Sequence, residues 1–108
     1  MAEKAPGFVT VLFECTAKPG KEEELRSVIA GLVTPTRSEP GCITYEFHTV
    51  EGKPGTFIAF EQWVSQEALD AHVKTAPLQA FIARSGELLR APFESGLQLL
   101  HPLRPQPK

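Results

Sequence analysis

The order in which two hydrophobic periodicities alternate along the chain constrains its fold most strongly. Residues 8–17 alternate apolar and polar side chains with the period of two that a strand requires, and the segment that follows carries apolar residues at helical spacing. Residues 42–51 and 56–63 return to the period of two, a helical stretch begins after Ser65, and residues 92–101 again favour a strand. The sequence therefore predicts the order β-α-β-β-α-β.

This order is typical of the ferredoxin-like α+β fold, an antiparallel sheet with both helices on one face. The strand order is then 4-1-3-2, which separates Cys15 from Cys42 by about two strand spacings, roughly 9.6 Å, beyond the reach of a disulfide. We expect both cysteines to be free thiols. The uncovered face of the sheet carries apolar residues, so we also expect a homodimer that packs sheet against sheet.

Prolines and glycines predict where the elements end. Pro35 should terminate the first helix, because the residue before a proline is pushed away from the helical region. Ser65 should cap the second helical stretch, and Pro77 should interrupt it. Gly86 is expected to break the turns that follow, and Gly96 indicates a bulge in the last strand.

The length of the chain favours one domain. Its 108 residues are divided here into a flexible segment at 1–7, a single domain at 8–101 and a proline-rich tail at 102–108. A domain of this size must fill its core almost completely. We therefore expect any ligand pocket between the helices and the sheet or at a subunit contact.

Charge and hydropathy exclude several classes of partner. The net charge is −2 and the basic residues are scattered, which argues against nucleic-acid binding. No apolar run is long enough for a membrane span, and the first residues lack a secretory signal, so we expect a cytoplasmic protein. The two cysteines lack zinc-site spacing, and no metal site is predicted.

Short motifs accompany the predicted elements in a fixed order. They are KPGKE at 18–22, RSEPGCITYE at 37–46, FEQW at 60–63, LDAH at 69–72, and Phe81. From residue 8 to about residue 100 the chain resembles the antibiotic biosynthesis monooxygenase domain family and is quinol monooxygenase-like. The family includes quinol monooxygenases and a signalling-molecule isomerase.

The resemblance implies a dimeric α+β barrel with a pocket in each protomer between sheet and helices. It also implies oxidation of a polycyclic or quinol substrate by O₂ with no metal or flavin cofactor. Relatives that degrade haem surround the porphyrin with an Asn, a Trp and a His. This chain offers Trp63 but has no Asn anywhere, which argues against haem breakdown and leaves Gln62 as a substitute donor.

His72 is the predicted catalytic base, because helical spacing places it on the same face as Leu69 and Val73. Imidazole has an unperturbed pKa near 6.5, and proton transfer to it from a phenol with a pKa of about 10 is uphill by roughly 5 kcal/mol. A turnover near 10 per second tolerates a barrier of about 16 kcal/mol. A purely structural, hydrogen-bonded histidine remains the alternative.

Four further residues are predicted to bind the substrate: Trp63, Tyr45, Phe81 and Glu61. Trp63 would form an aromatic wall or fill space between sheet and helix, and the Tyr45 hydroxyl would bind a substrate oxygen or occupy a core position. Glu61 and Glu46 lie on adjacent predicted strands, where such a pair either orients an imidazole or is solvated.

The favoured function is cofactor-independent oxidation of a small quinol, phenolic or polyketide-like aromatic compound by O₂. Two alternatives stay open. An isomerase of a small oxygenated metabolite would use His72 to shuttle a proton, and a non-catalytic protein would only bind an aromatic ligand.

Overall fold

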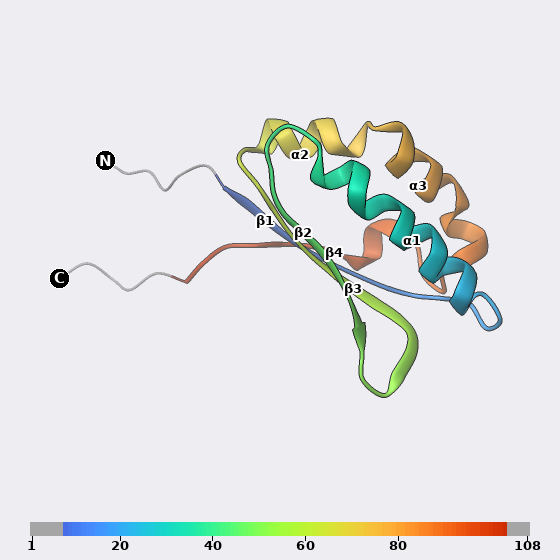
Figure 1. Cartoon of the computed structure of the whole chain (residues 1–108). Helices are drawn as coiled ribbons and strands as arrows, with labels where there is room; N and C mark the ends of the chain where they lie inside the picture. The colour runs from blue at the N-terminus through green and yellow to red at the C-terminus, as the bar shows by residue number, and fades with distance from the viewer. Residues whose placement is uncertain (1–7, 104–108) are drawn as a thin grey trace, which may run out of the picture.

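The computed structural model describes residues 8–103 and shows the predicted order of elements, with the second helical region divided in two (Figure 1). The elements are β1 (Val9–Thr16), α1 (Glu22–Arg37), β2 (Cys42–Val50), β3 (Lys53–Trp63), α2 (Gln66–Val73), α3 (Ala76–Leu88), the 3-10 turn η1 (Phe93–Gly96) and β4 (Leu97–Leu100). The expectations for residues 1–7 and 104–108 lie outside the described residues. No helix within residues 8–103 is long and apolar enough to cross a membrane.

The strands form one antiparallel sheet in the order β2-β3-β1-β4, which confirms the ferredoxin-like topology. The β1–β3 register runs without interruption from Val9 opposite Trp63 to Thr16 opposite Thr56. The β2–β3 register shifts between Cys42 and Thr44. Ile43 lies at this irregularity and is 43% exposed, whereas Tyr45, two residues later, is buried.

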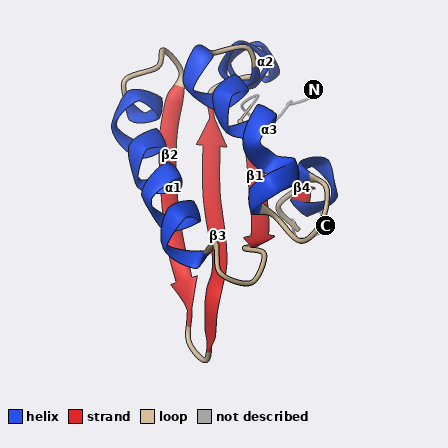
Figure 2. Ribbon diagram, turned by 90° about the vertical axis from the view of Figure 1, so that its right-hand side faces the viewer, coloured by secondary structure: helices blue, strands red, loops and turns tan. Residues whose placement is uncertain are grey.

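All three helices cover the same face of the sheet (Figure 2). The apolar stripe of α1 buries Leu25, Ile29 and Leu32 against inward residues of the strands such as Phe13 and Phe57. Trp63, at the end of β3, is fully buried. This layering places the core, and any pocket within it, between helices and sheet.

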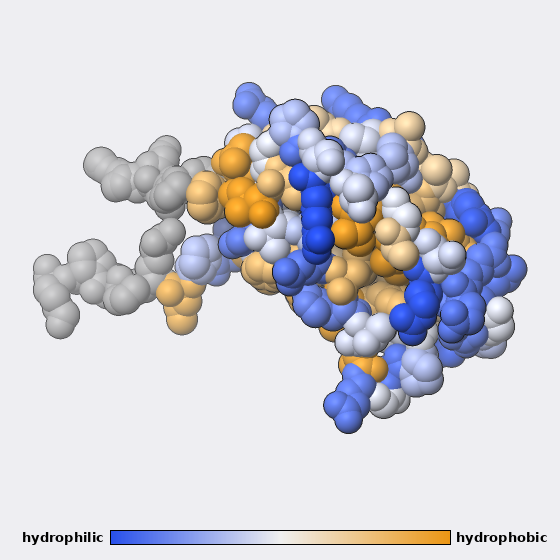
Figure 3. Space-filling model, viewed as in Figure 1, coloured by the Kyte–Doolittle hydropathy of each residue, from blue (hydrophilic) through white to orange (hydrophobic). Residues whose placement is uncertain are grey.

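The opposite face of the sheet has no covering element within the described residues. Leu12, Ile58, Phe60 and Leu100 alternate with the buried positions and point to this side, where they are only partly buried. Phe60, the first residue of the FEQW motif, pairs with Leu12 and therefore lies on the uncovered face. Apolar groups also reach the surface on the side drawn in Figure 3, whereas hydrophilic residues dominate its right-hand end.

Two predicted helix breaks are wrong. Helix α1 continues past Pro35 to Arg37, because a proline in the last turn removes only the bond to the Gly31 carbonyl. The Pro35 carbonyl still accepts a hydrogen bond from the Ser38 amide at 3.2 Å. Helix α3 runs through Gly86, which lies in open space on its surface. By contrast, Ser65 caps α2 as predicted, accepting from the Ala68 amide at 3.1 Å.

The last strand is shorter than predicted. Residues 93–96 form the 3-10 turn η1, and β4 pairs with β1 only from Leu97 onward. Gly96 belongs to this turn and not to a bulge: a Cβ at this position would lie 2.0 Å from the Glu14 carbonyl oxygen. Glycine is therefore required for close approach of the two backbones.

Cys15 and Cys42 are free, which confirms the prediction. They belong to β1 and β2, and β3 lies between these strands. Burial, and to a lesser extent Glu14, raises the pKa of the Cys15 thiol to about 12. Cys15 is therefore an inert core thiol near neutral pH.

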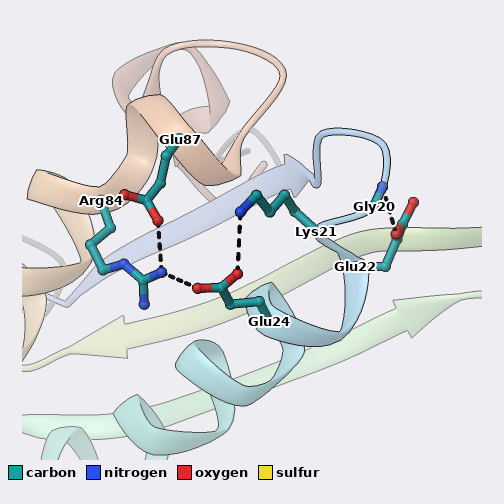
Figure 4. A network of polar contacts seen from close by, with 6 residues as sticks. All are labelled: Gly20, Lys21, Glu22, Glu24, Arg84 and Glu87. Atoms are coloured by element: carbon teal, nitrogen blue, oxygen red, sulfur yellow. Dashed lines mark hydrogen bonds and ion pairs between the residues drawn. The ribbon is translucent and has the colours of Figure 1, made fainter.

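A surface network holds α3 against the start of α1 (Figure 4). Arg84 of α3 contacts the Glu24 carboxylate and also Glu87, the latter at 2.8 Å. Lys21 reaches the other oxygen of Glu24 at 3.5 Å. These contacts lower the pKa of Glu24, chiefly through Arg84. The network lies at the solvent surface, apart from the cavity described next.

Candidate functional site

A cavity of about 380 Å³ lies between the sheet and the helices. Most of its wall is apolar, from β1, β2, α1, α3 and the C-terminal elements: Val11, Phe13, Leu32, Phe47, Leu78, Phe81, Phe93, Leu97 and Leu99. Polar groups come from Tyr45, Glu61 and His72, with Gln66 and Asp70 also on the wall. A mostly apolar cleft with a few polar groups is the usual form of a small-molecule site.

His72 occupies the last turn of α2 and is 3% exposed. Its Nδ1 lies 3.1 Å from both carboxylate oxygens of Glu39, a residue of the turn between α1 and β2. The Glu39 side chain is 15% exposed. An ionised carboxylate only accepts hydrogen bonds, so Nδ1 carries the proton and Nε2 of the neutral ring is left with its lone pair. The hydrogen bonds of the His72 ring within residues 8–103 involve Nδ1 alone, and His72 lines the cavity.

Gly41 lets α2 approach the Glu39 turn. Its φ is +86°, and a Cβ there would lie 2.7 Å from the Cβ of Ala68 and 2.9 Å from Cγ2 of Val64. The turn itself is held by the Glu39 amide, which donates to the Thr36 carbonyl at 3.0 Å. The glycine of the EPG segment therefore permits the contact between Glu39 and His72.

Trp63 stacks on His72, with ring centroids 4.6 Å apart and an interplanar angle of 30°. Its Nε1 donates to Oε1 of Glu61 at 3.0 Å. Trp63 does not line the cavity and is completely buried. The structure thus places it behind His72 and Glu61, where it orients both side chains.

Glu61 lines the cavity although it is 5% exposed. Its backbone lies opposite Tyr45 in the β2–β3 register. Burial raises the pKa of the Glu61 carboxyl, while the Trp63 hydrogen bond and the neighbouring His72 act in the opposite direction. The suggested pairing with Glu46 is wrong, because Glu46 faces the other side of the sheet and lies 3.6 Å from His48 at the surface.

Tyr45 and Phe81 both line the cavity. The Tyr45 ring meets His72 edge-on at 5.6 Å between centroids. Burial, followed by the charge of Glu61, raises the pKa of its phenol, and contact with the Thr36 hydroxyl offsets part of this effect. Thr36 is not on the cavity wall, so Tyr45 presents its ring to the cavity. Phe81 packs edge-on against Phe13 at 6.3 Å.

The structure therefore brings His72, Tyr45, Phe81 and Glu61 together around one space. Sequence reasoning did not identify Glu39 as a site residue. The only signal was an acidic residue in the turn before β2, and such residues are usually solvated. No group of three or more His, Cys, Asp or Glu side chains with the geometry of a metal site occurs in the part of the chain that the structure describes.

The antiparallel sheet, the helices on one of its faces and the apolar cavity between them place the protein in the class of ferredoxin-like α+β proteins with a small-molecule-sized cavity. Residues 8–84 match the sequence profile of the family described as "Antibiotic biosynthesis monooxygenase", and the chain belongs to this family.

Known relatives agree with this family. The chain is 38% identical to "Putative monooxygenase YcnE" of Bacillus subtilis over 71% of its own length and 81% of that protein. It is 37% identical to the uncharacterized protein sll1783 of Synechocystis over 80% of its length, but the match spans only 58% of that relative. Among solved structures, PA3566 of Pseudomonas aeruginosa superposes with a TM-score of 0.84 at 28% identity, over 94% of this chain and 100% of the other.

Proposed function

We propose that the protein is a cofactor-independent monooxygenase that oxidises a small quinol or related phenolic compound with O₂. His72, which lies on the wall of an apolar cavity and is bonded to Glu39, carries the proposal. Membership of the monooxygenase family and the similarity to YcnE, whose name describes a monooxygenase, support the reaction class. Free thiols at Cys15 and Cys42 are compatible with the cytoplasm as its location.

In this proposal His72 is the general base. Nε2 accepts the proton of a substrate hydroxyl, and the imidazolium that forms is stabilised by the Glu39 carboxylate 3.1 Å from Nδ1. The deprotonated substrate is a far better electron donor to O₂ than the neutral phenol. The histidine thus acts by preparing the substrate.

The overall reaction balances without a further reductant. A quinol and O₂ give a hydroxyquinone and water, so one oxygen atom enters the ring and the other leaves as water. The substrate supplies all four electrons that reduce O₂. The apolar walls, including Phe13 and Phe81, would hold the ring and exclude bulk water from the anion.

We further propose that the protein is a homodimer joined through the uncovered sheet face. Leu12, Ile58 and Phe60 lie on this face and are only partly buried in the single chain. Packing two such faces together would remove this apolar surface from water.

Oxygen consumption with menadiol tests the oxygenase proposal. The wild-type protein should consume O₂ above the spontaneous rate, and His72→Ala should lose roughly a hundredfold or more of this activity. His48→Ala is the matched control, because His48 is an exposed histidine of β2 away from the cavity. Circular dichroism would verify that both variants fold.

Three results would contradict the proposal. They are no O₂ uptake above the spontaneous rate with menadiol or related phenols, equal losses in both variants, and full activity in His72→Ala. Conversion of an oxygenated substrate under anaerobic conditions would favour an isomerase. Tight binding of ring compounds without turnover, unchanged in His72→Ala, would favour a binding protein.

A further inference from the structure

Glu61 leaves one polar atom unused on the wall of an apolar cavity. Oε1 accepts the Trp63 Nε1 hydrogen at 3.0 Å, and within residues 8–103 the other oxygen, Oε2, has no hydrogen-bond partner. Glu61 is only 5% exposed, and it lines the cavity. No fully buried side-chain N or O atom of the described residues lacks a partner, so Oε2 must keep some accessible surface, which the cavity provides. A ligand that fills the cavity would remove this atom from water and has to offer it a hydrogen bond in return.

The charges around Glu61 indicate which form of the carboxyl faces the cavity. His72, the nearest group that can become a cation, already bonds Glu39 through Nδ1. No Lys or Arg of the described residues forms an ion pair with Glu61. Its one partner is a neutral indole N–H. An ionised Glu61 near Glu39 would therefore be compensated only by the Trp63 hydrogen bond and the neighbouring His72, and burial, the largest effect, raises the pKa of the Glu61 carboxyl.

We propose that Glu61 is a neutral carboxylic acid whose Oε2–H donates a hydrogen bond to a carbonyl oxygen of the ligand, while Nε2 of His72 accepts from a ligand hydroxyl. Among phenolic compounds, the site would then favour those that also carry a carbonyl on the same edge of an apolar ring system. This inference rests on the proposed function only in taking the cavity as the place where the substrate binds.

The two groups have complementary tasks when the phenolic substrate also carries a conjugated carbonyl, a group that a simple quinol such as menadiol lacks. When His72 removes the hydroxyl proton, negative charge spreads to a conjugated carbonyl oxygen, and the hydrogen bond from Glu61 becomes stronger. Glu61 keeps its proton throughout, so the proton from the substrate resides on His72 alone. A neutral acid that stabilises a developing oxyanion lowers the barrier to proton removal.

Infrared spectroscopy tests the protonation state without any ligand. The difference spectrum of wild type minus Glu61→Gln at neutral pH should contain the C=O band of a protonated carboxylic acid. Glu46→Gln is the matched control, because Glu46 is exposed on the adjacent strand and should contribute only carboxylate bands. A carboxylate band for Glu61 would overturn the proposal.

Binding of 1-tetralone, a bicyclic ketone, tests the hydrogen bond to a carbonyl. Glutamine keeps an acceptor for Trp63 and offers an N–H toward the cavity, so Glu61→Gln should bind 1-tetralone within about threefold of wild type. Glu61→Leu should bind it roughly tenfold more weakly, with a smaller change for 1-naphthol, which offers only a hydroxyl. If Glu61 were ionised, the glutamine variant would bind the ketone more tightly than wild type.

The pH dependence of the wild-type protein gives a second measurement that needs no variant. Affinity for 1-tetralone should fall as Glu61 ionises with rising pH, and Glu61→Gln should show no such fall. The other titratable groups around Glu61 are Tyr45 and Cys42 of β2, Glu39 of the preceding turn, and His72 and Asp70 of α2. A fall that persists in the glutamine variant would assign the effect to one of these groups and overturn the proposal.

The outcome of these measurements is independent of the outcome of the oxygenase test. An acid band and carbonyl selectivity without O₂ consumption would refute the oxygenase and retain the role of Glu61. O₂ consumption with a carboxylate at Glu61 would do the reverse.

Discussion

At the scale of single residues, two glutamates of the site, Glu39 and Glu61, differ in solvent exposure and in hydrogen-bond partner. Glu39 retains 15% of its side-chain exposure and bonds His72. Glu61 is 5% exposed and bonds an indole. Burial without a paired cation penalises the ionised form of Glu61. In the proposed site, one glutamate therefore orients the base, and the other supplies a neutral donor.

Glu61→Gln should change how stability depends on pH. The folded-state pKa of Glu61 is raised above its unfolded value of about 4.3, so its stabilising contribution is complete below that pH and is lost as pH rises through the folded-state pKa. Relative to Glu61→Gln, the wild type should thus become less stable as the pH is raised from about 4 toward the folded-state value, by at most roughly 1.4 kcal/mol per pH unit. Urea unfolding of both proteins across this range measures the difference, and Glu46→Gln is the control. Parallel curves for wild type and Glu61→Gln would contradict the prediction.

At the scale of elements, the contact between α2 and the turn before β2 assembles the proposed base. Glu39 and His72 are 33 residues apart in sequence, and β2 and β3 form the chain between them. The N-cap at Ser65 fixes where α2 starts, and Gly41 fixes how closely it packs. The position of the imidazole is consequently set by one cap and one glycine.

Gly41→Ala should destabilise the protein by roughly 2–4 kcal/mol. About 1 kcal/mol comes from a side chain at positive φ, and the rest comes from overlap with Ala68 and Val64. Gly20→Ala is a close control, since Gly20 has the same φ of +86° but nothing within 4 Å of the added Cβ. Chemical denaturation gives the difference between the two variants. The prediction also expects a larger loss of oxidation rate in Gly41→Ala, and equal effects would refute the packing role.

The sequence predicted those helices and strands well that bury one face in the core, because burial of one face produces a regular spacing of apolar residues. The two periodicities gave the order of elements, and the ferredoxin-like fold that this order indicates gave the strand order. Periodicity was insufficient at Phe93–Gly96, because a single 3-10 turn is too short to carry a periodicity of its own. It was also insufficient at Pro35, where the position of a proline within the last turn decides its effect.

The site was predictable only in part. Helical spacing placed His72 on the core-facing side of its helix. Glu61 is two residues before Trp63 on the same strand, so strand alternation puts both side chains on the same face of the sheet. The partnership of Glu39 with His72 depends on the packing of a turn against α2, which no local pattern encodes. The stacking of Trp63 on the imidazole likewise depends on how α2 packs over the end of β3, which no local pattern encodes.

At the scale of the whole molecule, one face of the sheet is covered by helices and the other is not. The uncovered face includes Leu12, Ile58 and Phe60 near its centre. The proposed dimer would bury these residues while the cavities stay on the helical side of each protomer. Assembly and ligand binding would therefore use opposite faces of the same strands.

Phe60→Lys should weaken or abolish the proposed dimer, because burying an unpaired ammonium group between two sheets is unfavourable. Sedimentation velocity should show dimeric wild type and a monomeric or concentration-dependent variant. Glu67→Lys introduces the same side chain on an exposed position of α2 and should leave the mass unchanged. A monomeric wild type, or a dimeric Phe60→Lys, would contradict the proposed interface.

The groups proposed to handle protons lie in one stretch of the chain. Glu61 and His72 line the cavity, and Glu39 contacts His72; all three fall within residues 39–72, whereas Phe13, Phe81 and Phe93 of the lining come from β1, α3 and η1. Substitutions at these three aromatic positions can reshape the space for a ring while the proposed proton-handling groups keep their geometry. In the proposed enzyme, substrate preference and acid-base chemistry would thus be partly separable traits, and a change of substrate would require no new base.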